Sequence, residues 1–168
     1  MKDFTWKIFN SIQSLSICHP RIRTKMLQGM GVKMGQNAQI AENVYVGSNK
    51  LEMGKETYVN VGSFLDGSEK IIIEDYVRVG PYVKLLTGTH KYRNSVIRRR
   101  TEDGTLSKPV KIKKGCWIGL GAIILPGITV AEGCIVAAGS VVIRDTKPNG
   151  LYAGNPAKRV KDLATTDD

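Results

Sequence analysis

The stretch Ile112 to Val142, IKKGCWIGLGAIILPGITVAEGCIVAAGSVV, places an aliphatic residue at every sixth position: Ile112, Ile118, Ile124, Val130, Val136 and Val142. Upstream, the same spacing gives Met34, Ile40, Val46, Met53, Val59, Leu65, Ile73, Val79 and Leu85. A period of six fits neither a helix nor a single strand, whose side chains repeat every 3.6 and 2 residues. It fits short strands joined by corners, three to a triangular coil. These anchors therefore predict an all-β fold, a parallel β-helix of about five to six coils.

A second set of positions follows the anchors. Four residues after each anchor lies a mostly small or β-branched residue, in a series that includes Thr57, Thr89 and Cys116. The two exceptions are Lys50 and Glu69, and each precedes a point where the six-residue count slips. We expect the regular wall of the coil to be interrupted at these two points.

Three segments fall outside the regular coils. Residues 1–30 are predicted to form a helical cap, because helical spacing joins Phe4, Ile8, Ser11, Ile12 and Leu15. The β-helix itself is expected over 31–147, with a loop inserted at 91–111 that breaks the series. Residues 148–168 form a predicted C-terminal extension, with a short helix at 157–163 and a frayed end at 164–168.

Composition narrows the class of protein. The formal net charge of +10 and a pI near 9.6 would attract nucleic acid, anionic lipid, an acidic glycan or a phosphate-rich cofactor. No basic motif interleaved with aromatic residues supports nucleic acid. No run of eighteen apolar residues or secretory signal is present, so we expect no membrane span and a cytoplasmic location. Three scattered cysteines indicate reduced thiols, and no metal site is expected.

Several motifs resemble those of one family. They are Gly88-Thr89-His90, Lys108-Pro109-Val110, Cys116-Trp117-Ile118-Gly119, Ile124 to Val130, Ala138 to Val142 and Ala153 to Lys158. Together they resemble the hexapeptide-repeat acyltransferases, especially the maltose, galactoside, nodulation-type and exopolysaccharide sugar O-acetyltransferases. The resemblance implies a left-handed coil, a homotrimer with active sites between neighbouring prisms, and acetyl-CoA as co-substrate with no metal.

His90 is the expected general base. It ends the third coil where the inserted loop departs, and imidazole can take a proton near neutral pH. In the similar enzymes the matching histidine deprotonates the acceptor hydroxyl, which attacks the thioester directly. A packed structural ring is the alternative interpretation. His19 lies in the cap without such a context and is expected to be structural.

Three residues are candidates for the acceptor. Asn60 stands where the sugar acetyltransferases carry an asparagine that contacts the sugar, and its amide both donates and accepts. Asp66 is predicted either to bind the sugar or orient His90, or simply to cap a corner. Arg93 belongs to the inserted loop, whose balance of +4 favours an anionic acceptor but equally fits a solvated loop or salt bridges within a trimer.

The resemblance also assigns the acetyl-CoA site. It places the pantetheine arm along the coil edge, the nucleotide further on, and basic residues at the phosphates, through Trp117, Gly119, Leu120, Ala138, Ile143, Arg144, Lys158 and Lys161. Core packing of Trp117 and a solvated basic tail are the alternatives. Two other functions remain open: acetyl transfer to an amine of an aminosugar or antibiotic, and a non-enzymatic β-helix module.

Overall fold

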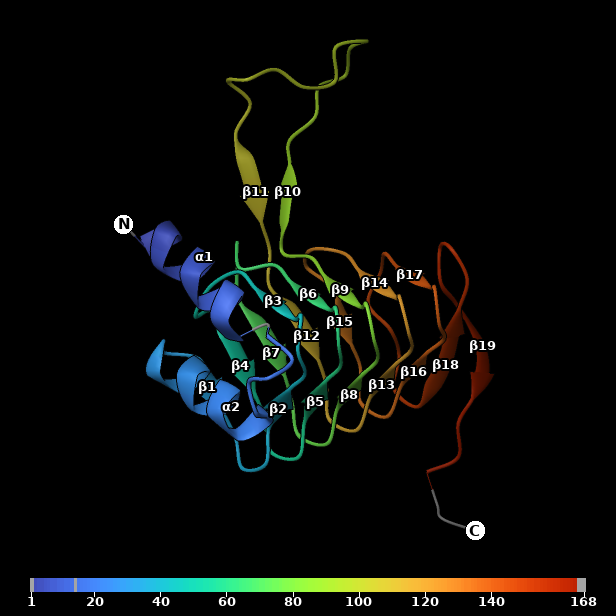
Figure 1. Cartoon of the computed structure of the whole chain (residues 1–168). Helices are drawn as coiled ribbons and strands as arrows, with labels where there is room; N and C mark the ends of the chain where they lie inside the picture. Colours follow the sequence, from blue (N-terminus) through green and yellow to red (C-terminus); the bar gives the residue numbers. More distant parts are fainter. Residues whose placement is uncertain (1, 14, 166–168) are drawn as a thin grey trace.

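The computed structural model describes residues 2–13 and 15–165, with side chains from Thr5 onward. Three sheets wrap around one core, and their strands are parallel except for the last strand of the second sheet (Figure 1). The first contains β1 (Lys33–Met34), β4 (Leu51–Met53), β7 (Ile71–Ile73), β12 (Val110–Ile112) and β15 (Thr129–Val130). The second contains β2 (Gln39–Ile40), β5 (Tyr58–Val59), β8 (Arg78–Val79), β13 (Trp117–Ile118), β16 (Ile135–Val136), β18 (Gly150–Ala153) and β19 (Lys158–Asp162). The third contains β3 (Tyr45–Val46), β6 (Phe64–Leu65), β9 (Lys84–Leu85), β14 (Ile123–Ile124) and β17 (Val141–Val142).

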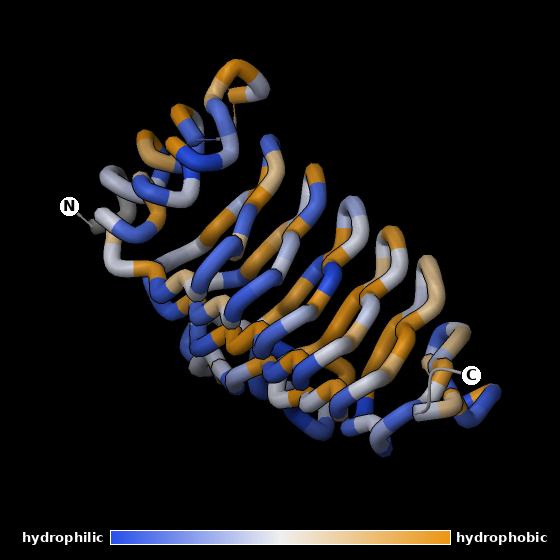
Figure 2. The backbone as a smooth tube through the Cα atoms, turned by 90° about the horizontal axis from the view of Figure 1, so that it is seen from below, coloured by the Kyte–Doolittle hydropathy of each residue, from blue (hydrophilic) through white to orange (hydrophobic). Residues whose placement is uncertain are grey.

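The predicted β-helix is confirmed. Each coil contributes one strand to each sheet, which gives five complete coils, and β18 begins a sixth. Fourteen of the fifteen anchors are buried, and Met34 at the first coil is partly buried. The apolar side chains form one buried cluster inside the coils. Figure 2 shows the backbone of these coils stacked along the prism. Burial of this single column of aliphatic side chains is the main stabilising term of the fold.

The interruptions of the repeat also lie where the sequence places them. Strands β4 and β7 are three residues long, so Leu51 and Ile71 each add a buried side chain before the anchor. Lys50 and Glu69, just before these strands, are not buried. Thr89 is a correction: it is exposed, and Thr87 is the buried residue, because the chain leaves the coil two residues earlier than the spacing predicts.

Two helices cover the first coil, as expected for the N-terminal segment. They are α1 (Lys2–Gln13) and α2 (Pro20–Gly29), and both lie at the same end of the prism (Figure 1). An open solenoid end leaves backbone groups unpaired, and side chains of the cap bond them here. The amide of Asn10 bonds both the N–H and the C=O of Val46, and Gln13 donates to Val44 O. Within the described residues, neither helix is long and apolar enough to cross a bilayer.

The C-terminal segment corrects the sequence prediction. Residues 158–162 form strand β19, which pairs antiparallel with β18, so the predicted helix at 157–163 is wrong. The physical reason is the open edge of β18 at the end of the prism, whose backbone groups need partners. Arg159 secures the hairpin by donating to the carbonyls of Lys147, Pro148 and Asn149. Residues 166–168 of the predicted frayed end lie outside the described residues.

Candidate active site

The loop expected at 91–111 is an arm whose two sides pair at its base, but its bounds differ from the prediction: the arm begins at Gly88, and Val110 and Lys111 already belong to the coil. Strand β10 (Gly88–His90) runs antiparallel to β11 (Thr105–Ser107), and the arm projects away from the prism (Figure 1). The chain then returns to the first sheet at β12, where Val110 pairs with Ile71. The prism therefore continues in register after the insertion, and β12 is the first strand of the fourth coil. The arm itself begins with β10, at the corner that follows β9.

His90 lies in this paired base. It is opposite Thr105 in the ladder, and its side chain is exposed. A pocket of about 360 Å³ opens beside it, lined by residues that include Asp66, Ser68, Thr105, Leu106 and Ser107 as well as His90. A small cavity lined mainly by residues with hydroxyl, carboxylate and imidazole side chains suits a polar, hydroxyl-bearing ligand.

Asp66 lines this pocket and accepts four hydrogen bonds. One carboxylate oxygen accepts the N–H groups of Thr87 and Gly88 at 3.0 and 2.7 Å, and the other accepts the N–H and the hydroxyl of Ser68. Burial acts to raise the pKa of Asp66, but these hydrogen bonds outweigh it and leave the pKa below its usual value. The carboxylate thus fixes the backbone two residues before His90, which is the corner-capping role.

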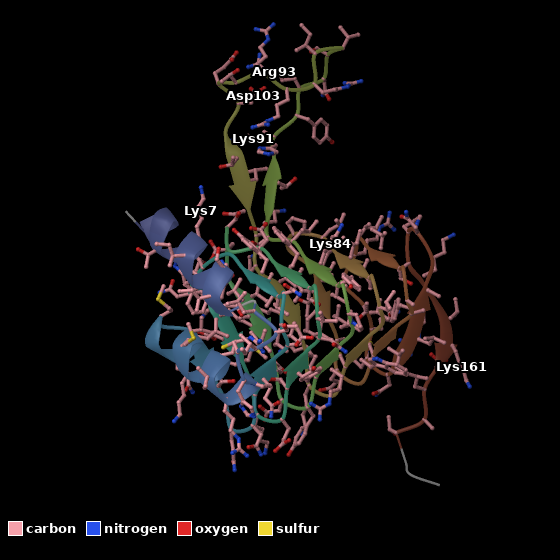
Figure 3. The ribbon with its side chains drawn as sticks, viewed as in Figure 1. Lys7, Lys84, Lys91, Arg93, Asp103 and Lys161 are labelled. Atoms are coloured by element: carbon pink, nitrogen blue, oxygen red, sulfur yellow. The ribbon has the colours of Figure 1, made fainter. Side chains whose placement is uncertain are left out.

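Arg93 is engaged within the arm. Its guanidinium bonds both carboxylate oxygens of Asp103, at 2.7 to 3.0 Å, and lies 3.3 Å from Glu102. Figure 3 shows Arg93 and Asp103 close together near the far end of the arm. The hydrogen bond from Arg93 holds the pKa of Asp103 below its usual range. Arg93 therefore shapes the arm in this conformation, while Arg98, Arg99 and Arg100 are exposed.

Four predicted site residues stack at one corner of the prism, between the second and third sheets. They are Asn60 after β5, Gly119 and Leu120 after β13, and Ala138 after β16, and we call this the first corner. Coils approach closely here: a Cβ on Gly119 would lie 2.6 Å from the backbone nitrogen of Ala138. Leu120 and Ala138 are exposed. The Oδ1 atom of Asn60 accepts the N–H of Val61, and its amide NH₂ is a further donor group at this corner.

Trp117 lies on the outer face of the second sheet beside the first corner, and it is exposed rather than packed in the core. The strand registers put it in one outward row with Ile135, Leu151 and Lys161. Lys158 and Lys161 are both exposed on β19. The aromatic and the two cations thus lie along one sheet, from the fourth coil to the end of the prism, where Figure 3 labels Lys161.

The remaining predicted residues lie at another corner. Asp66 follows β6, His90 belongs to the arm that follows β9, and Ile143 and Arg144 follow β17, all at the end of the third sheet, which we call the second corner. One copy of the chain therefore separates the residues assigned to acetyl-CoA at the first corner from the imidazole at the second.

Sequence reasoning missed four pocket residues: Ser68, Thr105, Leu106 and Ser107. Ser68 lies in the slip before Ile73, where the repeat gives no position to a side chain. Thr105 and Ser107 belong to the returning strand of the arm, which has no apolar alternation to reveal it. Within 2–13 and 15–165, no group of three or more His, Cys, Asp or Glu is arranged to hold a metal ion.

Comparison with known proteins agrees with this architecture. The family described as bacterial transferase hexapeptide (six repeats) matches residues 109–144. A putative acetyltransferase of Schizosaccharomyces pombe is 39% identical over 118 residues, which cover 67% of this chain and 53% of that protein. The chain thus spans about half the length of this relative.

Two solved structures superpose on nearly the whole chain. A maltose O-acetyltransferase from Clostridium difficile 630 has a TM-score of 0.87 at 26% identity, covering 96% of this chain and 86% of that one. A hexapeptide-repeat acetyltransferase from Vibrio cholerae in complex with acetyl-CoA has a TM-score of 0.82 at 26% identity, covering 96% and 87%. Both likenesses extend over the cap, the coils and the arm.

Proposed function

The chain belongs to the hexapeptide-repeat family, and from that membership we propose that it is an acetyltransferase that moves the acetyl group of acetyl-CoA to a hydroxyl of a sugar or glycan. The observation that carries the proposal is His90 beside a polar pocket at the base of the arm. Its neighbours in that pocket are hydroxyl and carboxylate groups, which suit a hydroxyl-rich acceptor. The similar structures of a maltose O-acetyltransferase and of an acetyl-CoA complex support both substrates.

The chemistry needs one base and one leaving group. An imidazole nitrogen of His90 takes the proton of the acceptor hydroxyl while the oxygen attacks the thioester carbonyl carbon. The new C–O bond forms, the C–S bond breaks, and the CoA thiolate leaves and takes the proton back from the imidazolium. Asp66 is a positioning residue, since its carboxylate bonds the backbone of Thr87 and Gly88 rather than the imidazole.

We propose a homotrimer as the active assembly. The first corner carries Gly119, Leu120 and Ala138, along which the pantetheine arm would lie, with Trp117, Lys158 and Lys161 on the adjoining sheet. The second corner carries His90, Ile143 and Arg144. A cyclic arrangement would set the first corner of one copy against the second corner of the next, and so complete three equivalent sites. Asn60, at the first corner, would then reach the acceptor held by the neighbouring copy.

The acceptor is expected to be neutral or anionic rather than cationic. Arg98, Arg99 and Arg100 are exposed on the arm beyond the pocket, whereas Arg93 is paired. Cations near the entrance attract an acidic glycan or a nucleotide-linked sugar. The proposal keeps the cytoplasmic location expected from the sequence, and the free thiols of Cys18, Cys116 and Cys134 support a reducing compartment.

The test is release of CoA thiol from acetyl-CoA in the presence of a panel of sugars and aminosugars. We expect turnover with sugar hydroxyls, and we expect His90→Ala to lower kcat about a hundredfold to ten-thousandfold without changing the fold. His19→Ala is the matched control, because His19 is an exposed histidine in the cap. Turnover confined to aminosugars would indicate amine acetylation, and full activity of His90→Ala would overturn the assigned base.

A further inference from the structure

The cap presents aliphatic side chains to solvent. Helix α1 buries Phe9 and Gln13, and beside this buried side Ile8 and Ile12 are 46% and 48% exposed. Leu15 and Ile17, in the connection to α2, are 53% and 90% exposed. Ile8 and Ile12 are four residues apart and therefore lie on one side of the helix, so α1 leaves an apolar side uncovered next to the side that packs on the prism.

The same cap is strongly basic. From residue 1 to residue 41 the sequence contains six Lys or Arg and a single acidic residue, Asp3. Lys7 on α1 and Arg21 and Lys25 on α2 are exposed, whereas Arg23 is buried. Helix α2 buries Arg23 and Leu27, so Arg21 and Lys25 lie on the side turned away from the prism. Figure 3 shows Lys7 at this end of the molecule, far from Lys161 at the other.

From this juxtaposition we propose that the outer face of the cap docks on an anionic lipid bilayer. Aliphatic side chains flanked by an excess of cations are the features of a helix that lies in the membrane interface. The side chains of Ile8, Ile12, Leu15 and Ile17 enter the region between headgroups and acyl chains. The negative lipid phosphates attract the positive charges of Lys7, Arg21 and Lys25.

A second copy of the chain fits this face less well. Two caps meeting face to face would bring the same cations together, and like charges in a contact oppose association. An anionic bilayer satisfies both the apolar and the charged side chains at once. The cap is therefore assigned to lipid, and the pocket beside His90 is not part of this surface.

The experiment is co-sedimentation of the full chain with vesicles, without acetyl-CoA. One set contains equal parts of phosphatidylglycerol and phosphatidylcholine, and the other phosphatidylcholine alone. We expect binding to the anionic vesicles that weakens in high salt, and a loss of at least about tenfold in Ile8→Asn/Ile12→Asn and in Lys7→Glu/Lys25→Glu. The matched control is Val96→Asn/Ile97→Asn, which replaces two exposed aliphatic side chains on the arm.

Circular dichroism establishes that each variant is folded before binding is compared. Equal binding to both vesicle types, or equal binding by the wild type and the cap variants, overturns the proposal. So does a higher assembly that forms without lipid and disappears in the cap variants, because a second copy would then be the occupant. Since no acetyl transfer is measured, failure here leaves the proposed enzymatic function standing, and the reverse also holds.

Discussion

Asp66 is the side chain through which the prism holds the base of the arm. Four hydrogen bonds converge on its carboxylate, and two of them come from the backbone that leads directly into His90. Of the alternatives weighed for this residue, the hydrogen bonds favour a capping carboxylate over direct contact with the imidazole. Its effect on catalysis is therefore expected to be indirect, through the position of β10.

Asp66→Asn tests this role at the scale of one residue. An amide accepts through only one oxygen, so the variant should be less stable at pH 7 by about 1 to 2 kcal/mol. Because folding lowers the pKa of Asp66, its carboxylate contributes to the free energy of unfolding. This contribution is fully present above the unfolded-state pKa of about 3.9, and it is lost as pH falls through the lower pKa of the folded state. Thermal unfolding should therefore show a gap in midpoint temperature between the two proteins at pH 7 that narrows as pH falls below about 4. A gap that stays constant with pH would contradict the account.

Arg23 shows where residue-level prediction from sequence fails. It is a fully buried cation, and its guanidinium donates to the carbonyls of Gln13, Leu15, Cys18 and Ile40. Charged side chains are usually exposed, so no pattern in the sequence sets it apart from Arg21. The anchors were predictable for the opposite reason, because an inward position in a narrow coil accepts only an apolar side chain.

At the scale of elements, the guanidinium of Arg23 joins the cap to the prism. It bonds the end of α1, the connection to α2 and the edge of β2 at once. Arg23→Met would keep the bulk but leave several buried carbonyls without donors, and should lower the free energy of unfolding by about 3 kcal/mol. Urea denaturation measures this. Arg21→Met on the same helix should change it by less than about 0.5 kcal/mol, and equal effects of the two substitutions would contradict the role of Arg23.

The elements that the sequence did not predict share one physical feature. Strands β10 and β11 read GTH and TLS, and β19 reads KRVKD, and none contains more than one large apolar residue. They form because neighbouring backbone groups need partners at the arm base and at the open edge of β18, which is a tertiary cause. The coils were predictable because each turn repeats the same local requirement for a buried aliphatic side chain every six residues.

At the scale of the whole molecule, the two corners impose a condition on activity. His90 and Arg144 lie at one corner, and Gly119 and Ala138 lie at the other, so under the proposed function one prism does not hold a complete site. The residues of each corner could be listed from the sequence, but their separation could not, because it depends on which side of a coil each turn occupies. The proposed function therefore requires that two copies of the chain share each site.

Mixed assemblies test this sharing most directly. His90→Ala removes the base at the second corner, and Ala138→Trp should fill the path of the pantetheine arm at the first, so each variant alone should be inactive. In a trimer that contains both, one of the three interfaces pairs an intact first corner with an intact second corner. Random mixing in equal amounts should then restore about a quarter of the wild-type rate. A mixture that forms mixed trimers yet stays as inactive as its parents, or a chain that remains monomeric, would contradict the account.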